Sequence, residues 1–113
     1  MTLDKLYTLL KQTGYPVAYY QFESKKNNPP PNPPYIIYWT PESSSYGADT
    51  SKALVRNSTV HVELYTTKKD LQAETKLEAA LDSKCIHYDK DEANIESEKL
   101  YQILYSFELI EKL

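Results

Sequence analysis

The sequence predicts an α+β domain in which a mostly antiparallel β-sheet is packed by two α-helices. Two observations favour this class. Segments that alternate apolar and polar residues, as strands do, cluster along the chain, and two segments with helical spacing of apolar residues stand apart from them. Because 113 residues form one domain with one core, residues 1–113 are expected to be a single compact unit with two long loops.

The first expected element is a helix that begins after Thr2, whose hydroxyl can cap the first turn. Gly14 suits a C-terminal cap and Pro16 prevents continuation, so this helix should end near Thr13. Its apolar stripe has the spacing i, i+3, i+4 and i+7 and consists of Leu3, Leu6, Tyr7 and Leu10.

Two strands with a long connection are expected next. Residues 17–22 and 35–40 are rich in β-branched and aromatic residues, and the prediction is an antiparallel hairpin. Residues 23–34 between them hold five of the seven prolines. Proline lacks an N–H donor and fixes φ, so the segment is predicted to be an extended, exposed loop, with a proline-rich recognition peptide as the alternative.

A second long loop is predicted at residues 41–51, which include a serine run and Gly47. Residues 53–55 form a short extended candidate, and residues 57–58 are expected to be a turn. Residues 60–65 alternate cleanly, which predicts a strand with one face in the core. The core side is Val60, Val62 and Leu64, and the opposite side is His61, Glu63 and Tyr65.

A second helix is expected from Thr67, with Asp70 completing an approximate capping box, to about Ser83. Its predicted buried face is Leu71, Leu77, Ala80 and Leu81. Its acidic residues recur every four positions and are expected to line one exposed face, where a basic group on a neighbouring molecule would relieve their repulsion. A plain solvated face is the alternative interpretation of this row, which comprises Asp70, Glu74, Glu78 and Asp82.

The last third of the chain predicts two more strands. Residues 85–88 are expected to be a short strand and residues 95–110 a long strand. Residues 89–96 are expected to be a solvated hairpin turn, with an acidic contact surface as the alternative. One face of the long strand is Tyr101, Ile103, Tyr105, Phe107 and Leu109, and the other is Gln102, Leu104, Ser106, Glu108 and Ile110.

No pattern in the sequence indicates catalysis, a cofactor or a metal site. His61 and His87 lie in strand-like patterns, and Cys85, the one cysteine, is expected to be a small buried hydrophobe. The acidic segment at residues 89–96 lacks the glycine that a calcium loop needs. Two glycines cannot build a phosphate-binding loop. We therefore expect a protein that is not an enzyme.

Charge and hydropathy also restrict the class of partner. The net charge is −3, and the basic residues are scattered, which argues against sequence-specific binding of nucleic acid. The apolar runs are too short for a membrane span or a secretion signal. The eleven tyrosines are unusual, because most of them fall in predicted strands on both faces of the sheet. A second tyrosine-rich face is useful to a subunit that assembles with others.

Three segments together resemble a known family: residues 34–38, residues 62–66 with Lys69 and Asp70, and residues 96–98 with Leu100, Tyr101, Gln102 and Tyr105. They are similar to the small tail-completion proteins of long-tailed bacteriophages and prophages of Gram-positive bacteria, which include tail terminators and head-tail joining proteins. The resemblance covers most of the chain, although the proline density of residues 29–34 departs from it.

The resemblance implies a virion protein of the tail or neck, present in the bacterial host cytoplasm during assembly. Such a subunit forms a homo-oligomeric ring, commonly a hexamer, at the head-proximal end of the tail, with tail-tube and head-tail connector proteins as partners. DNA passes through the lumen of the ring, and an acidic lumen would let it pass without sticking. The sequence also leaves open a monomeric acidic protein-binding module, an inhibitor or adaptor of a prophage or host, that masks a basic partner.

Assembly contacts are expected in both long loops, because loops longer than a domain needs are often functional. Within the second loop, residues 43–49 are expected to become ordered only in the assembly. The candidate contacts are Ser43, Tyr46, Asp49, Tyr65, Asp70, Glu74 and Glu78.

Overall fold

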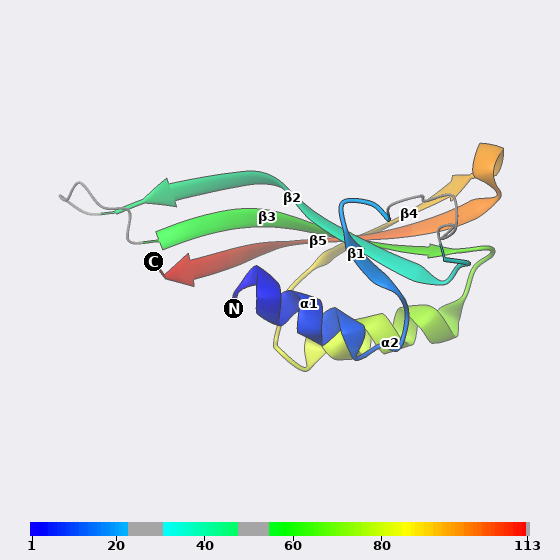
Figure 1. The fold of residues 1–113 in the computed structure, drawn as a ribbon, viewed down its shortest axis with the longest axis horizontal. Coiled ribbons are helices and arrows are strands. Elements are labelled where there is room, and N and C mark those ends of the chain that lie inside the picture. Colours follow the sequence, from blue (N-terminus) through cyan, green and yellow to red (C-terminus); the bar gives the residue numbers. More distant parts are fainter. Residues whose placement is uncertain (23–30, 48–54, 113) are drawn as a thin grey trace.

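The computed structural model describes residues 1–22, 31–47 and 55–112. Its elements are α1 (Leu3–Lys11), β1 (Val17–Tyr19), β2 (Tyr35–Tyr46), β3 (Val55–Thr66), α2 (Leu71–Asp82), β4 (Asp89–Ile95), the short 3-10 helix η1 (Glu96–Glu98) and β5 (Leu100–Lys112). The five strands form one sheet in the order β1-β2-β3-β5-β4. Both helices cover the same face of this sheet (Figure 1), which confirms the predicted α+β class.

Helix α1 begins where its capping residue predicts. The Lys5 backbone N–H donates a hydrogen bond of 3.3 Å to the Thr2 hydroxyl, which satisfies one of the free donors of the first turn. After the helix, Gly14 turns the chain with a φ of +86°, a conformation that favours glycine. The buried stripe is Leu6, Leu9 and Leu10, whereas Tyr7 is 39% exposed.

Strand β1 is shorter than predicted and runs in the other direction. It pairs with β2 in parallel, with Val17 opposite Ile36 and Tyr19 opposite Tyr38, so the predicted antiparallel hairpin is wrong. A parallel pair needs a connection of about a dozen residues or more. The sequence between β1 and β2, residues 20–34, supplies that length.

The predicted second loop is wrong for residues 41–46, because β2 continues through them to Tyr46. The predicted turn at residues 57–58 is also wrong, since Ser43 pairs with Ser58 inside the β2–β3 ladder. Pro41 lies where the register shifts between Trp39 and Glu42, and at such an irregularity a missing N–H donor is tolerated. The remainder of both predicted loops, residues 23–30 and 48–51, lies outside the described residues, as do residues 53 and 54.

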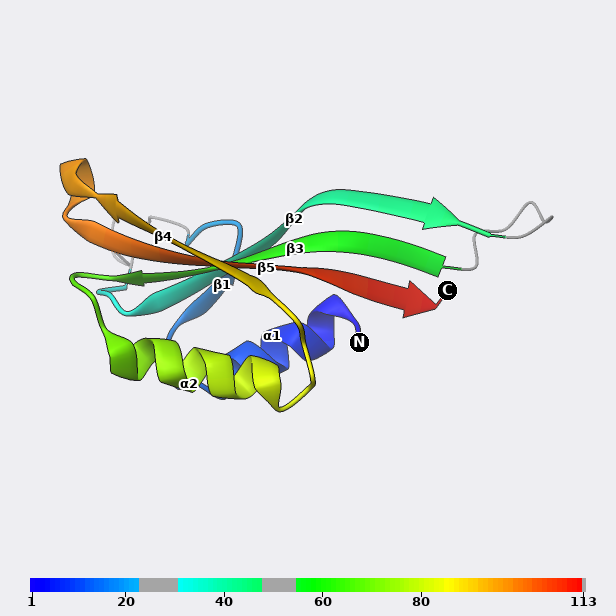
Figure 2. The same cartoon turned by 180° about the vertical axis from the view of Figure 1, so that it is seen from behind.

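Strands β2, β3 and β5 run past the ends of the helices as a three-stranded arm, which Figure 2 shows from behind. We define the arm as residues 41–46, 55–59 and 108–112. The radius of gyration is 15.7 Å, whereas roughly 13 Å is typical of a rounded domain of this length. The arm accounts for this extended shape.

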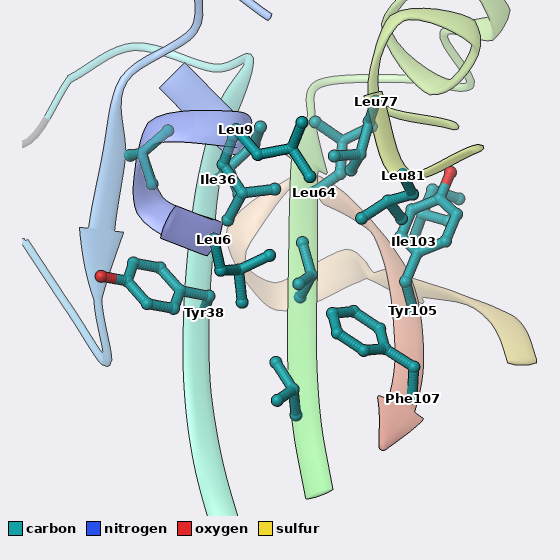
Figure 3. Close-up of a cluster of buried hydrophobic side chains, with 14 of the residues drawn as sticks. Leu6, Leu9, Ile36, Tyr38, Leu64, Leu77, Leu81, Ile103, Tyr105 and Phe107 are labelled. Carbon is teal, nitrogen blue, oxygen red and sulfur yellow. The ribbon is translucent and has the colours of Figure 1, made fainter. Parts of the chain in front are cut away.

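The hydrophobic core lies between the two helices and one face of the sheet (Figure 3). The predicted core positions of β3 are confirmed, since Val60, Val62 and Leu64 are fully buried. The predicted alternation of β5 is confirmed as well, because its odd-numbered residues from Ile103 to Leu109 are buried and its even-numbered residues lie on the other face. The helices contribute Leu6, Leu9, Leu10, Ala73, Leu77 and Leu81.

Helix α2 begins four residues later than Thr67, the predicted start. Asp70 is its N-cap, and the Asp70 carboxylate accepts a 3.1 Å hydrogen bond from the backbone N–H of Ala73. The Thr66 hydroxyl instead donates to the carbonyl of Lys68. Leu71 is 67% exposed and does not belong to the buried face, which is a correction. No helix of the described residues is long and apolar enough to cross a membrane.

In the region before β5, the strand and the turn lie at other residues than predicted. Residues 85–88 form no strand, and Cys85 is exposed, with φ of +55°, instead of buried as predicted. The predicted turn at residues 89–96 is the edge strand β4, which pairs with β5. The turn lies at residues 96–99 instead and ends in the left-handed Lys99, so β5 begins at Leu100.

Candidate functional site

The face of the sheet opposite the helices is not covered by any described element. We call it the open face. Its members follow from the register, because residues directly opposite one another share a face. The open face of the central strands comprises Tyr35, Ile37, Trp39, Thr59, His61, Glu63, Tyr65, Gln102, Leu104, Ser106 and Glu108. The position predicted for Tyr65, on the side opposite Val62 and Leu64, is confirmed.

Aromatic rings form two groups of three on the open face. The Tyr35 and Tyr65 rings lie with centroids 5.1 Å apart, and Phe22 packs edge-on against Tyr35 at 5.4 Å. The Trp39 ring packs edge-on against His61 at 5.4 Å and against Tyr20 at 5.7 Å. We call these six residues the aromatic cluster. Its central rings are half-buried by one another, with no second layer of protein above them among the described residues.

The Glu63 carboxylate ties the aromatic cluster together from its centre. It accepts a 2.6 Å hydrogen bond from Trp39 Nε1 at one oxygen and a 2.6 Å bond from the Tyr65 hydroxyl at the other. The Gln102 amide donates to both Glu63, at 3.3 Å, and the Tyr65 hydroxyl, at 2.9 Å. Burial and, after it, the hydrogen bond to Glu63 raise the pKa of Tyr65 far above its usual value of 10.0. The rings are therefore held in fixed positions before any partner binds.

A second polar network joins α2 to the edge strand β4 on the covered face. Lys90 Nζ of β4 lies 2.7 Å from a Glu74 carboxylate oxygen and 2.9 Å from a Glu78 oxygen. Lys69 Nζ lies 2.9 Å from the other Glu74 oxygen and also pairs with Glu92. We call these five residues the lysine clamp. The Tyr105 hydroxyl, which is mostly buried, donates to Glu78 at 2.8 Å and completes it.

The lysine clamp overturns the predicted exposed acidic row on α2. Glu74 is only 2% exposed, and Asp70 caps the helix instead of lying on its surface. Burial alone would raise the pKa of Glu74, but the hydrogen bonds from Lys90 and Lys69 outweigh it and hold the pKa below 4.5. The repulsion that we expected a neighbouring molecule to relieve is relieved within the chain.

The predicted assembly contacts fall in three separate places. Ser43 and Tyr46 lie on the arm, where the hydroxyls of Ser43 and Ser58 are 2.8 Å apart and Tyr46 is 54% exposed. Asp49 lies outside the described residues. Tyr65 belongs to the open face, and the three acidic candidates, Asp70, Glu74 and Glu78, lie at α2. The structure therefore keeps these acids together, but places none of them on the arm or on the open face.

The sequence interpretation missed Trp39, Glu63 and Lys90 as members of these networks. Trp39 and Glu63 could have been found, because strand alternation in residues 35–40 and 60–65 puts both on the faces that carry Tyr35 and Tyr65. Lys90 could not, because the segment that holds it reads as a solvated turn. Only the β4–β5 pairing turns its side chain toward α2.

Concave surfaces are shallow. Two grooves of about 500 and 400 Å³ lie on the helical layer, and a third of about 380 Å³ is lined by Cys85, His87, Asp89 and parts of β3 and β5. Within the described residues, no group of three or more His, Cys, Asp or Glu side chains is arranged to hold a metal ion.

Comparison with known proteins adds no family. No protein-family model matches the sequence, and no curated protein is significantly similar to it.

Proposed function

We propose that this chain is a structural protein of a bacteriophage or prophage that oligomerises into a ring at the head-proximal end of the tail. There it completes the tail or joins it to the head. The sequence resemblance suggests this class, and the observation that carries the oligomerisation is the open face with its aromatic cluster.

A single domain needs only one apolar face of a sheet, which here packs against the helices. The open face nevertheless presents large rings that Glu63 holds in place. Tyrosine and tryptophan are enriched at protein interfaces, and rigid rings lose little conformational entropy when a partner covers them. The central strands β2, β3 and β5 have 12 or 13 residues each. At about 3.3 Å per residue and 4.8 Å per strand, their open side covers roughly 600 Å² along its whole length, arm included. That approaches the ~800 Å² per partner of a standard interface.

The arm offers a second surface without a covering layer of described protein. Its three strands extend beyond the helices, and Tyr46 and Ile110 are 54% and 59% exposed there. An extension of this kind can reach a neighbouring subunit or the tail tube without moving the body of the domain.

The alternative function is a monomeric acidic module that masks a basic partner. Two of the α2 acids that could serve it, Glu74 and Glu78, are bound by Lys69 and Lys90 of the same chain. A paired carboxylate that is turned toward the sheet offers little to a basic partner.

Light scattering on the purified protein, together with electron microscopy of the protein mixed with the tail tubes of its phage, tests the proposal. The single tryptophan, Trp39, provides a second readout, because covering the open face should shift its fluorescence to shorter wavelength. A Tyr35→Ser variant should weaken oligomerisation, whereas Ser97→Ala, an exposed change in η1, should not. A chain that stays monomeric at high concentration and leaves tail tubes uncapped contradicts the proposal.

A further inference from the structure

Resting on the proposed ring, we infer that its subunits associate head to tail, with the helical layer of one copy seated on the open face of the next copy. The two surfaces lie on opposite sides of one chain and carry opposite charge. Each copy therefore presents both halves of the interface.

The open face is acidic. The register places five carboxylates on it or at its borders and one lysine at its far end: Glu42, Glu63, Asp89, Asp91 and Glu108 against Lys112. The alternation is clear in β4, where Lys90 turns toward α2 and its neighbours Asp89 and Asp91 consequently turn to the open face. Glu63 forms no ion pair with a basic side chain of the described residues. Its hydrogen bonds come from Trp39, Tyr65 and Gln102.

The outer surface of the helical layer is basic. Its exposed charged residues on α1, on α2 and directly after α2 are Lys5, Lys11, Lys76 and Lys84 against Asp4 and Asp82. This excess of positive charge exists because Glu74 and Glu78 turn inward to the lysine clamp. The chain as a whole has a net charge of −3, so a basic surface on it reflects an uneven distribution of charge between its two sides.

The basic side chains line a concave strip. Lys5 and Lys84 line the groove of about 500 Å³, Lys76 lines the groove of about 400 Å³, and Gln12 belongs to both. The Lys76 ammonium lies 5.4 Å from the centre of the Tyr15 ring, which favours a fixed position for its charge. Two adjoining grooves whose linings hold three lysines against the single acid Asp4 suit a surface that carries protruding rings and carboxylates.

The charges also decide between the two symmetries that a pair of identical chains can adopt. In a two-fold interface, the open face would meet an open face and acids would oppose acids, which disfavours that arrangement. A head-to-tail contact instead brings unlike charges together. It leaves the pair with one free open face and one free helical layer, so addition continues until the rotation closes a ring.

A charge-swap experiment tests this arrangement. The first variant, Lys5→Glu with Lys76→Glu and Lys84→Glu, makes the helical layer acidic. The second variant, Asp89→Lys with Asp91→Lys and Glu108→Lys, makes the open face basic. All six side chains are exposed, so both variants should keep the circular dichroism spectrum of the wild type. In light scattering, each variant alone should associate more than about tenfold more weakly than the wild type. An equimolar mixture should assemble again, because each surface then meets one of opposite charge.

The matched control is Glu96→Lys, which reverses an exposed charge on η1 that belongs to neither set of surface charges and should assemble as the wild type does. A second measurement uses the wild type alone, whose association should weaken as salt rises. Folded variants that assemble alone, folded variants that do not combine in the mixture, or a wild-type oligomer indifferent to salt would each overturn the head-to-tail arrangement. If the wild type still caps tail tubes in these cases, the proposed function stands. A wild type that neither oligomerises nor binds tail tubes contradicts both the head-to-tail arrangement and the proposed function.

Discussion

Replacing Lys90 by methionine removes the charge that bridges α2 and β4, while keeping most of the unbranched side chain. In the wild-type protein, Lys90 Nζ contacts a Glu74 oxygen at 2.7 Å and a Glu78 oxygen at 2.9 Å. The variant leaves the buried Glu74 carboxylate with Lys69 as its one remaining cation among the described residues. We expect the free energy of unfolding to fall.

The size of the loss follows from the burial of Glu74, whose side chain is 3% exposed. Removing one partner from a buried ion pair costs about 3–5 kcal/mol when the remaining charge has no compensation. Because Lys69 still contacts Glu74, we expect about 2–3 kcal/mol. For a chain of 113 residues, that corresponds to a fall of roughly 10 °C in Tm.

Urea unfolding, followed by circular dichroism, measures the loss, and two further variants make it interpretable. Lys69→Met should cost less, because Lys69 is more exposed than Lys90 and its second partner, Glu92, lies at the surface. Adding Glu74→Gln to Lys90→Met should recover part of the stability, since the neutral amide removes the stranded charge.

The pH dependence provides an independent check with a definite sign. Burial opposes ionisation of Glu74, but the lysine hydrogen bonds hold its pKa below 4.5. A depressed pKa contributes stability above the unfolded pKa, and this stability is lost as the pH falls through the folded pKa. A protonated Glu74 forms no ion pair with Lys90. The difference in free energy of unfolding between the wild type and Lys90→Met should therefore narrow below about pH 4.5. A difference that stays constant, or a Glu74→Gln change that adds its full cost to that of Lys90→Met, would refute this reasoning.

Three other predictions follow from burial and backbone geometry. Leu77→Ala should lower the free energy of unfolding by about 2–5 kcal/mol, whereas Leu71→Ala, in the same helix but exposed, should change it by less than about 0.5 kcal/mol in urea unfolding. Gly14→Ala should lower the free energy of unfolding by about 1 kcal/mol in thermal unfolding, because alanine is strained at the φ of +86°. No steric clash should add to this cost, since an added Cβ would meet no atom within 4 Å. Burial and hydrogen bonds to carboxylates raise the pKa of Tyr65 and Tyr105, so the stability they contribute is present below pH 10 and lost above it. Ultraviolet titration should find at least two tyrosines that ionise only as the protein unfolds.

Strand alternation was predictable wherever one face of a strand enters the core. Val60, Val62 and Leu64, and the odd-numbered residues of β5, repeat every second position, and a register slip would expose all of them. The same logic placed Tyr65 on the open face before its contacts were known. Burial at every second position can therefore be predicted from the sequence alone.

Polar strands were not predictable, because their stability comes from partners far away in the chain. The residues of β4 are exposed apart from the half-buried Ile95, and the strand is formed by pairing with β5 and by the contacts of Lys90 with α2. The serine-rich part of β2 is similar, since Ser43 and Tyr46 extend β2 only because β3 lies beside them. The parallel direction of β1 likewise depends on its pairing with β2, because the composition of a strand does not show which way it runs beside its neighbour.

The acids of α2 show why spacing alone misassigns a candidate site. The sequence predicts the helix start at Thr67, whereas the N-cap is Asp70, three residues later. Either start leaves Glu74 and Glu78 in the same positions relative to the apolar residues of the helix. They turn inward because the buried face is Ala73, Leu77 and Leu81 and does not include Leu71, and because Lys69 and Lys90 lie within reach of their carboxylates.

Strand β4 has no residue in the hydrophobic core, so its attachment to the domain depends on the β5 ladder and the lysine clamp. Ion pairs weaken as salt screens them, so the attachment of β4 should weaken as the ionic strength rises. The free energy of opening β4 locally should therefore be lower than that of global unfolding, and β4 amide protons should exchange before those of β3. Each such opening bares the backbone donors and acceptors of β5 along residues 100–106, a template for a strand from another chain. By keeping β4 in place, Lys69 and Lys90 thus keep the backbone of β5 from pairing with a strand of another chain.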